Sequence, residues 1–244
     1  MGLKGKKVAF IGAGNMANSL IRGILAKGKS PSTVLAADID ATKLGSLRKE
    51  TKIETMSNQE NVDRADVIVL AVKPQIMESV CLDLNLFASS KLIISIAAGT
   101  TVTQLQKWLG NATPVVRCMP NTPALIGKGA TGMFANKHVD HNQRLLAEEI
   151  MGTVGMSAWV ERESDIDIIT AVSGSGPAYF FLFMEAMEEA AQELGLSEDL
   201  AKSLIYNTAA GAAELAKTSG GSAAELREKV TSPISRRISL RINP

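Results

Sequence analysis

The sequence predicts an α/β fold in which a doubly wound strand-and-helix domain is followed by an all-helical domain. Short apolar runs alternate with helical patterns from Lys7 to about Val160, and helical patterns alone follow Glu161. The composition, with 45% hydrophobic and 21% charged residues in a chain of 244, is typical of a globular protein. We therefore expect one domain over 1–161 and a second over 162–244.

The predicted strands are near-continuous apolar stretches, as expected for strands buried on both faces of a parallel sheet. They are Val8–Ile11, Val34–Ala37, Val67–Ala71, Leu92–Ile96, Val115–Cys118, Thr131–Ala135 and Ser157–Val160, with a weaker candidate at Lys52–Thr55. Helices are predicted between them from apolar residues at helical spacing, at Met16–Ala26, Thr42–Glu50, Gln59–Ala65, Ile76–Leu82, Val102–Leu109 and Asn142–Met151.

The C-terminal part is predicted to hold four helices, Asp165–Val172, Pro177–Leu194, Ser197–Thr218 and Ser222–Val230. The second begins with the run Tyr179–Met184, which is apolar all round and must be buried on every side. One small helical domain cannot bury it alone, and the small residues of Ala209–Ala213 let another helix approach closely. We expect an obligate homodimer whose helical domains interleave.

Charge and cysteine content exclude several function classes. The 26 basic and 25 acidic residues leave no field that would attract nucleic acid or an anionic membrane. The first apolar run stops at Gly12, too short for a signal or a membrane span, which predicts a cytoplasmic protein. Two cysteines, and two histidines in a polar run without cysteine partners, predict neither a disulfide framework nor a metal site.

The strongest chemical signal is the turn between the first strand and the first helix. Its residues are Gly12, Ala13, Gly14, Asn15, Met16 and Ala17. Gly12 permits a tight turn, Gly14 lets the backbone approach a pyrophosphate, and Ala17 allows close packing of helix on strand. Phosphates then face the free N–H groups of the helix N-terminus. The order strand, turn, helix and strand predicts a Rossmann-type dinucleotide-binding domain.

Asp38 ends the second strand, about 20 residues after the turn, where an acid accepts hydrogen bonds from the adenosine ribose and repels a 2′-phosphate. Taken alone, this residue favours NADH. Asp40 competes for the same role, and Lys43 or Asn58 can receive a phosphate. The sequence therefore leaves NADPH and NADH open.

Two further strand ends are expected to face the cofactor, because ligands of such sheets bind beyond the carboxyl ends of the strands. The first loop holds Ala71, Val72, Lys73 and Pro74, and the second holds Ala97, Ala98 and Gly99. The small residues of the second loop leave room for the nicotinamide ribose. Lys73 either donates to the cofactor or is an ordinary exposed lysine.

Two other segments are candidates for the reacting pocket. Asn121 and Thr122 stand between two prolines after a buried strand and either line the pocket or form a turn. The run from Ser173 through Ser175 to Pro177 is richer in glycine than a helix cap needs, so its N–H groups either hold a substrate carboxylate or cap a helix. Cys118 is expected to be a buried structural thiol.

The two histidines, His138 and His141, are expected to have no catalytic role. They lie in a solvated loop that leads into a helix, with Asp140 as the expected cap of that helix.

Read together, the motifs GAGNMA, AVKPQ, SIAAG, RCMPNTPA and SGSGPAYFF resemble the pyrroline-5-carboxylate reductases, from about Lys6 to Pro233. The resemblance implies hydride transfer from NADPH or NADH to a cyclic imine, which yields L-proline. It also implies an N-terminal Rossmann-type doubly wound sheet, a C-terminal all-helical dimerisation domain exchanged between subunits, and further assembly of dimers.

The resemblance further implies particular site residues. Cofactor contacts are implied at Gly12, Gly14, Asn15, Met16, Asn58, Ala71, Lys73, Pro74, Ala97 and Gly99. Glu163 and the segment from Val230 through Ser232 to Pro233 are implied to lie near the substrate. A protonated cyclic imine is already electrophilic, so the protein need only orient two reactants, and no histidine is required.

The chain departs from the family pattern after Pro233. The family continues with a Gly-Gly pair, a substrate-contacting threonine and a helix, whereas residues 234–244 read ISRRISLRINP and resemble a frameshift or a truncation. We expect this form to bind dinucleotide but to reduce substrate poorly.

Two other readings compete with the reductase. A 3-hydroxyacid dehydrogenase of the β-hydroxyacid type also joins a Rossmann domain to a helical one, but it needs a lysine early in the interdomain helix, and Gly176–Met187 contains none. A non-catalytic dinucleotide sensor is the third reading, and it predicts binding without turnover.

Overall fold

The structure is a computed structural model that describes residues 3, 5–88 and 91–231. By packing, the chain divides into two compact units, Met1–Pro177 and Ala178–Pro244. The sequence-based division between 161 and 162 marks where the strand–helix alternation ends. The packing division comes later because the segment after the last strand packs against the sheet of the first unit.

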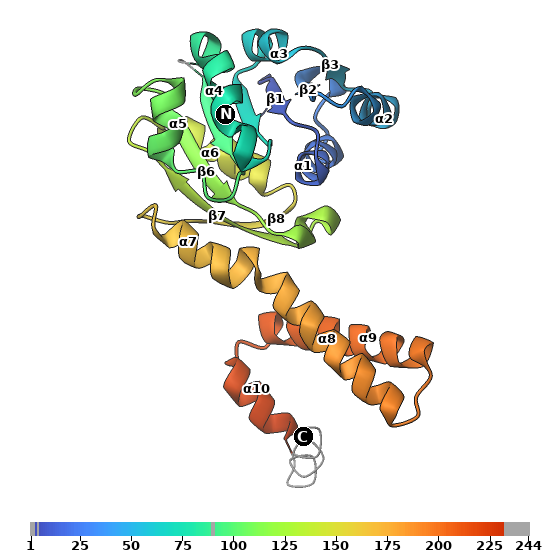
Figure 1. Ribbon diagram of the computed structural model, residues 1–244. Coiled ribbons are helices and arrows are strands. Elements are labelled where there is room, and N and C mark those ends of the chain that lie inside the picture. Colours follow the sequence, from blue (N-terminus) through green and yellow to red (C-terminus); the bar gives the residue numbers. More distant parts are fainter. Residues whose placement is uncertain (1–2, 4, 89–90, 232–244) are drawn as a thin grey trace. The chain divides into compact units, whose positions relative to one another are not determined.

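The first unit is built on one eight-stranded sheet in the order β3-β2-β1-β4-β5-β6-β7-β8 (Figure 1). The strands are β1 (Val8–Ile11), β2 (Val34–Ala37), β3 (Glu54–Thr55), β4 (Val67–Leu70), β5 (Leu92–Ser95), β6 (Val115–Met119), β7 (Gly129–Ala135) and β8 (Gly155–Trp159). All predicted strands are confirmed, and the weak candidate at Lys52–Thr55 is reduced to two residues.

The expectation of a parallel sheet is wrong at one place. β7 runs antiparallel to β6, with Val116 paired to Ala135, whereas every other pair is parallel. A parallel neighbour needs a long crossover, but only the short 3₁₀ segment η2 (Thr122–Ile126) separates these two strands. The chain therefore returns directly, and the carboxyl end of β7 lies at the edge opposite to that of β6.

Both faces of the sheet are buried, as the continuous apolar strands predict. In β1, Val8 and Phe10 belong to one core and Ala9 and Ile11 to the other, because successive side chains point to opposite faces. Residues of α1 (Asn15–Ala26), α2 (Ala41–Thr51) and α6 (His141–Met151) complete the first core. Residues of α3 (Asn58–Arg64), α4 (Pro74–Ala88) and α5 (Val102–Leu109) complete the second.

Several helices differ from their predicted bounds by one residue, and two differ by more. α4 ends at Ala88 and not at the predicted Leu82. α4 begins at Pro74, earlier than the predicted Ile76, because proline is well suited to the first position of a helix. The predicted helix Asp165–Val172 divides into α7 (Asp165–Ile169) and a π-helical turn, η3 (Thr170–Gly174). A π turn inside a helix is rare and is often found at functional sites.

The second unit contains the rest of α8 (Gly176–Glu193), α9 (Glu198–Thr218) and α10 (Ala223–Val230). The side chains of Tyr179–Phe183 are 60–67% exposed in the single chain. Such a run of large apolar side chains does not remain in water in a stable protein. In the single chain, the apolar surface of Tyr179–Phe183, which the sequence predicts to be buried, is therefore exposed.

Candidate dinucleotide site

Most of the predicted cofactor residues lie at one edge of the sheet. β2, β1, β4, β5 and β6 are neighbours and run parallel, so that their carboxyl ends meet there. The loops that follow them carry Gly12, Asp38, Ala71, Ala97 and Asn121. β1 lies at the point where the strand order reverses, and open α/β sheets bind ligands in the crevice at that point.

The glycine turn over β1 requires its two glycines for different reasons. Gly12 has φ +101°, and a Cβ on it would lie 2.6 Å from the carbonyl oxygen of Ala71. Gly14 has no atom within 4 Å of the place where its Cβ would be, so the space above it is open. Gly14 is also the N-cap of α1, and among the described residues no side chain caps that helix.

This geometry fits the pyrophosphate of a dinucleotide. Side chains of Asp40, Ser57, Thr101, Asp140 and Ser222 cap other helices of the chain. The uncapped first turn of α1 points its N–H groups and its positive dipole end into the open space, which favours an anion. The turn residues therefore suit the group that the sequence predicts.

Asp38 braces this turn. Its Oδ2 accepts a hydrogen bond of 2.7 Å from the N–H of Ala13, and its Oδ1 accepts one of 2.9 Å from the N–H of Asp40. Asp40, the sequence-based competitor, caps α2 by accepting from the N–H groups of Thr42 and Lys43. Asp38 thus lies at the predicted place, and each of its carboxylate oxygens accepts a hydrogen bond from a backbone N–H.

A cavity of about 570 Å³ opens beside the turn, between α1 and α2. Its lining includes Gly14, Asn15, Arg22 and Lys43. The ammonium of Lys43 lies 3.5 Å from a carboxylate oxygen of Asp40 and is largely exposed. The structure therefore brings Lys43 to the glycine turn as a cation that a phosphate can approach.

Asn58, the other residue considered for phosphate binding, is the first residue of α3. It is half-buried and is not among the residues that line this cavity.

The two remaining cofactor loops differ in exposure. After β4, Ala71 donates its N–H to the carbonyl of Ile11, and Lys73 is exposed. After β5, Ala97 is buried, whereas Ala98 and Gly99 are exposed, with Gly99 at φ +73°. The loop thus presents a small, side-chain-poor surface, which matches the space expected for a nicotinamide ribose.

The two predicted substrate segments meet through Asn121. Its Nδ2 donates to the backbone oxygen and to the Oγ of Ser173, both at 3.2 Å, and its Oδ1 accepts from the N–H of Ala130. The amide therefore ties the loop after β6 to β7 and to the π turn. Ser175 is exposed, and its N–H donates to the carbonyl of Thr170.

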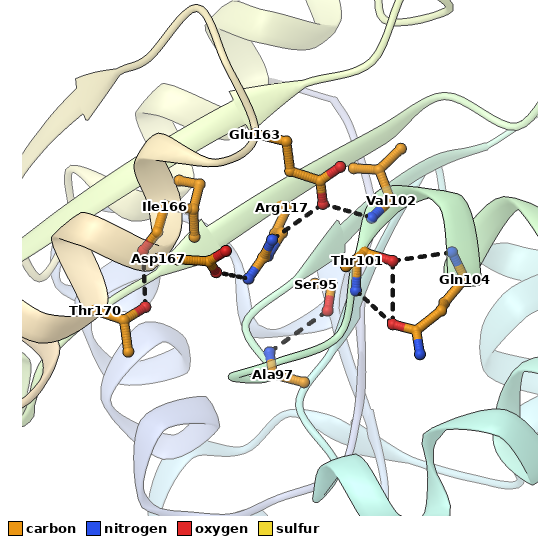
Figure 2. A network of polar contacts seen from close by, with 10 residues as sticks. All are labelled: Ser95, Ala97, Thr101, Val102, Gln104, Arg117, Glu163, Ile166, Asp167 and Thr170. Carbon is orange, nitrogen blue, oxygen red and sulfur yellow. Dashed lines mark hydrogen bonds and ion pairs between the residues drawn. The ribbon is translucent and has the colours of Figure 1, made fainter.

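Glu163 does not lie alone. Its Oε1 accepts from Arg117 Nη1 at 3.1 Å and from the N–H of Val102 at 2.7 Å, and Arg117 Nη2 donates to Asp167 Oδ1 at 2.8 Å (Figure 2). Sequence reasoning missed Arg117 and Asp167. The available signal was a single arginine within an apolar strand, since a buried arginine requires acidic partners.

The last predicted substrate residues lie outside the unit that carries this edge. Val230 ends α10 in the second unit and is exposed, and Ser232 lies outside the described residues. The atypical segment 234–244 also lies outside them.

Two family models match the chain, each over one of its parts. The model described as pyrroline-5-carboxylate reductase dimerisation matches residues 163–235. The model described as NADP oxidoreductase, coenzyme F420-dependent, matches residues 7–99.

Known proteins are similar over nearly the whole chain. A pyrroline-5-carboxylate reductase of Pseudomonas aeruginosa is 49% identical over 229 residues, which cover 93% of this chain and 84% of that protein. The structure of a Coxiella burnetii pyrroline-5-carboxylate reductase is 42% identical, with a TM-score of 0.91, and the match covers 96% of this chain and 89% of that one. A Plasmodium falciparum pyrroline carboxylate reductase with NADP bound is 33% identical, with a TM-score of 0.86 and coverage of 98% and 90%.

Proposed function

The chain belongs to the pyrroline-5-carboxylate reductase family, and from this premise we propose that it reduces 1-pyrroline-5-carboxylate to L-proline with NADPH or NADH. A bound dinucleotide would supply the hydride for the imine carbon, and the imine nitrogen would carry a proton taken from solvent. The relatives reported above are named pyrroline-5-carboxylate reductases, which supports this reaction over that of a 3-hydroxyacid dehydrogenase.

One observation carries the proposal for this chain's own residues. Only glycine fits at position 12, because the backbone there lies against Ala71. Gly14, the N-cap of α1, faces open space, and no side chain caps the helix among the described residues. A turn of this kind offers backbone N–H groups to a pyrophosphate, and a side chain at either glycine would obstruct it.

The cofactor residues divide by the group that they serve. The glycine turn is assigned to the pyrophosphate. The carboxyl end of β2 and the start of α3 are assigned to the adenosine, and the loops after β4 and β5 to the nicotinamide end. In chain order the assigned residues are Gly12, Ala13, Gly14, Asn15, Met16, Asp38, Asn58, Ala71, Val72, Lys73, Pro74, Ala97, Ala98 and Gly99.

The substrate is assigned to the segment 162–244 together with the loop after β6. Asn121 supports this assignment, because its amide joins that loop to Ser173 and the π turn. Ser175 is exposed two residues further on. Val230 and Ser232 enter the proposal on the family pattern alone.

These residues act by orientation. A protonated imine is already electrophilic, so a site that holds it in register with a hydride donor can lower the barrier by roughly 7–11 kcal/mol without an acid group. Backbone N–H groups can neutralise the substrate carboxylate at the same time.

The chain carries a dimerisation domain, and we propose that two such domains interleave and that dimers assemble further. The exposed run Tyr179–Phe183 supports this, since it gives each chain an apolar surface that another copy can cover.

The same apolar stretch bears on location. Asp165–Glu193 is long and apolar enough to cross a membrane by composition. The dimerisation model covers this stretch, so we assign its apolar surface to subunit contact and propose a cytoplasmic enzyme.

A cofactor-oxidation assay with 1-pyrroline-5-carboxylate tests the proposal. NADPH and NADH are run in parallel, with a 3-hydroxyacid and oxidised cofactor as the control reaction. We expect imine-dependent oxidation and no turnover of the hydroxyacid.

The same assay on a chain with a family-like C-terminus tests the effect of residues 234–244. The variant is expected to turn over faster at equal dinucleotide affinity. Dinucleotide binding without turnover of the imine by either chain would favour the sensor and contradict the reductase.

A further inference from the structure

Arg117 is a buried cation held between two acids of a distant segment. It belongs to β6 and is 3% exposed, and its guanidinium bonds both Glu163 and Asp167 (Figure 2). A buried guanidinium without partners would be strongly destabilising, so at least one of these acids must remain in place. Asp167 is 71% exposed and Glu163 is 25% exposed, so Glu163 is the partner better shielded from solvent.

Glu163 also performs a second task that Asp167 does not. Its Oε1 accepts the N–H of Val102, the first residue of α5, at 2.7 Å. The capping box of Thr101 and Gln104 bonds neighbouring donors of this helix start. A carboxylate placed there also interacts favourably with the helix dipole. An acid 61 residues away in sequence thus completes the start of α5.

This hydrogen bond lies at the carboxyl end of the loop before α5. Ala97 and Thr100 are buried, and Ala98 and Gly99 are exposed between them. Glu163 bonds the chain at Val102, on the carboxyl side of this loop. The exposed pair thus lies between two buried residues, and the hydrogen bond from Val102 to Glu163 follows shortly after it in the chain.

We propose that Glu163 is a positioning residue for the dinucleotide, acting through the N–H of Val102 on the loop Ala97–Gly99. The inference rests on the proposed function, because it takes this loop as the surface that receives the nicotinamide end. A loop that is already held in its binding conformation loses less conformational entropy when the dinucleotide binds. The hydrogen bond from Val102 to Glu163 therefore raises the affinity for the dinucleotide. Arg117 in turn orients the Glu163 carboxylate toward Val102.

This role differs from contact with the substrate, which the family resemblance implies for Glu163. A substrate contact would change the KM for the imine and leave dinucleotide binding intact. A positioning role would change the dissociation constant of the dinucleotide in the absence of substrate. Binding to the enzyme without substrate therefore separates the two.

Two conservative variants separate the effect of the length of the Glu163 side chain from the effect of its charge. Glu163→Asp keeps the charge beside Arg117 but is one methylene shorter and cannot reach Val102 in the same way. Glu163→Gln keeps the length and an acceptor oxygen but loses the charge. Asp167→Asn is the matched control, because Asp167 bonds the same guanidinium and, within the described part of the chain, has no hydrogen bond to α5.

The measurement is a titration of the purified full chain with NADPH and with NADH, followed by fluorescence. Glu163→Asp is expected to weaken binding about tenfold, Glu163→Gln by less than about threefold and Asp167→Asn by less than about twofold. Amide hydrogen exchange without ligand is expected to speed up at Val102 in Glu163→Asp alone. Thermal unfolding shows whether each variant is folded.

The inference is overturned if Glu163→Asp binds as tightly as the unchanged chain, or if Glu163→Gln and Asp167→Asn are weakened as much as Glu163→Asp. A wild-type chain that binds neither dinucleotide would instead refute the proposed function, so the two failures are distinguishable.

Discussion

The carboxylate of Asp38 accepts a 2.7 Å hydrogen bond from the N–H of Ala13, so the end of β2 supports the glycine turn that follows β1. The second oxygen of Asp38 accepts from the N–H of Asp40. The acid that the sequence predicts to bind the ribose therefore also holds the backbone that is proposed to receive the pyrophosphate.

Asp38→Ala is expected to weaken binding of NADH and NADPH by a similar factor, about tenfold, because the brace of the turn is lost for both. Titration with each dinucleotide measures this. Asp140→Ala is the control: Asp140 likewise accepts a backbone N–H, from Gln143, but it follows β7 at the other edge of the sheet. A loss confined to NADH would show that recognition of the ribose dominates over bracing.

Gly12→Ala is expected to abolish dinucleotide binding and to destabilise the fold by about 1–3 kcal/mol, because φ is +101° and the new Cβ would lie 2.6 Å from the Ala71 oxygen. Gly45→Ala is the matched control. Gly45 lies exposed within α2 with nothing near its Cβ position, so alanine there should stabilise the chain by up to about 1 kcal/mol. Urea unfolding and titration measure both; tight binding by the Gly12 variant would contradict the assigned site.

His138→Ala and His141→Ala are each expected to keep activity within about tenfold, or 1.4 kcal/mol. The physical reason is their position. β7 is antiparallel to β6, so the segment after Ala135 lies at the edge of the sheet away from Gly12. Cofactor oxidation measures the rates, and a greater loss for either variant would contradict the expectation that the histidines have no catalytic role.

The acid stability of the chain is expected to depend partly on Asp66. Burial raises the pKa of Asp66, but the N–H of Lys7 and the charges of Lys6 and Lys91 together lower it by more, so the pKa lies below its ordinary value. A depressed carboxyl pKa stabilises the fold above the unfolded value of about 3.9, and this stability is lost as the pH falls through the folded value.

Asp66→Asn should therefore lower the free energy of unfolding at pH 7 and have little effect near pH 2. Denaturant unfolding across this range measures the difference. Asp63→Asn, at an exposed position on α3, is the control. A difference between wild type and Asp66→Asn that stayed constant with pH would show that the lost interaction is not one of charge.

The sequence alone predicts most of the fold because its signals are local. β1 and β2 occur at their predicted residues, since an apolar run bounded by Gly12 or Asp38 has few other structures available. Cys118 is buried as expected, and burial raises the pKa of its thiol. Asp140 caps α6 as expected.

Other features depend on packing between distant segments. The antiparallel β7 follows from the short path between β6 and β7, which hydrophobic patterning does not encode. The early start of α4 and the π turn after α7 likewise escape patterning, because each shifts a helix by only a few residues.

What the sequence by itself determined is the glycine turn after β1 and the family to which the chain belongs. A glycine at positive φ followed by a helix start is a constraint on adjacent residues, and it is therefore legible in their order. What only the tertiary structure decided is which charges meet. Strand register and the return of the chain after β8 bring together Arg117, Glu163 and Val102. The spacing of these residues along the sequence does not predict that they are in contact.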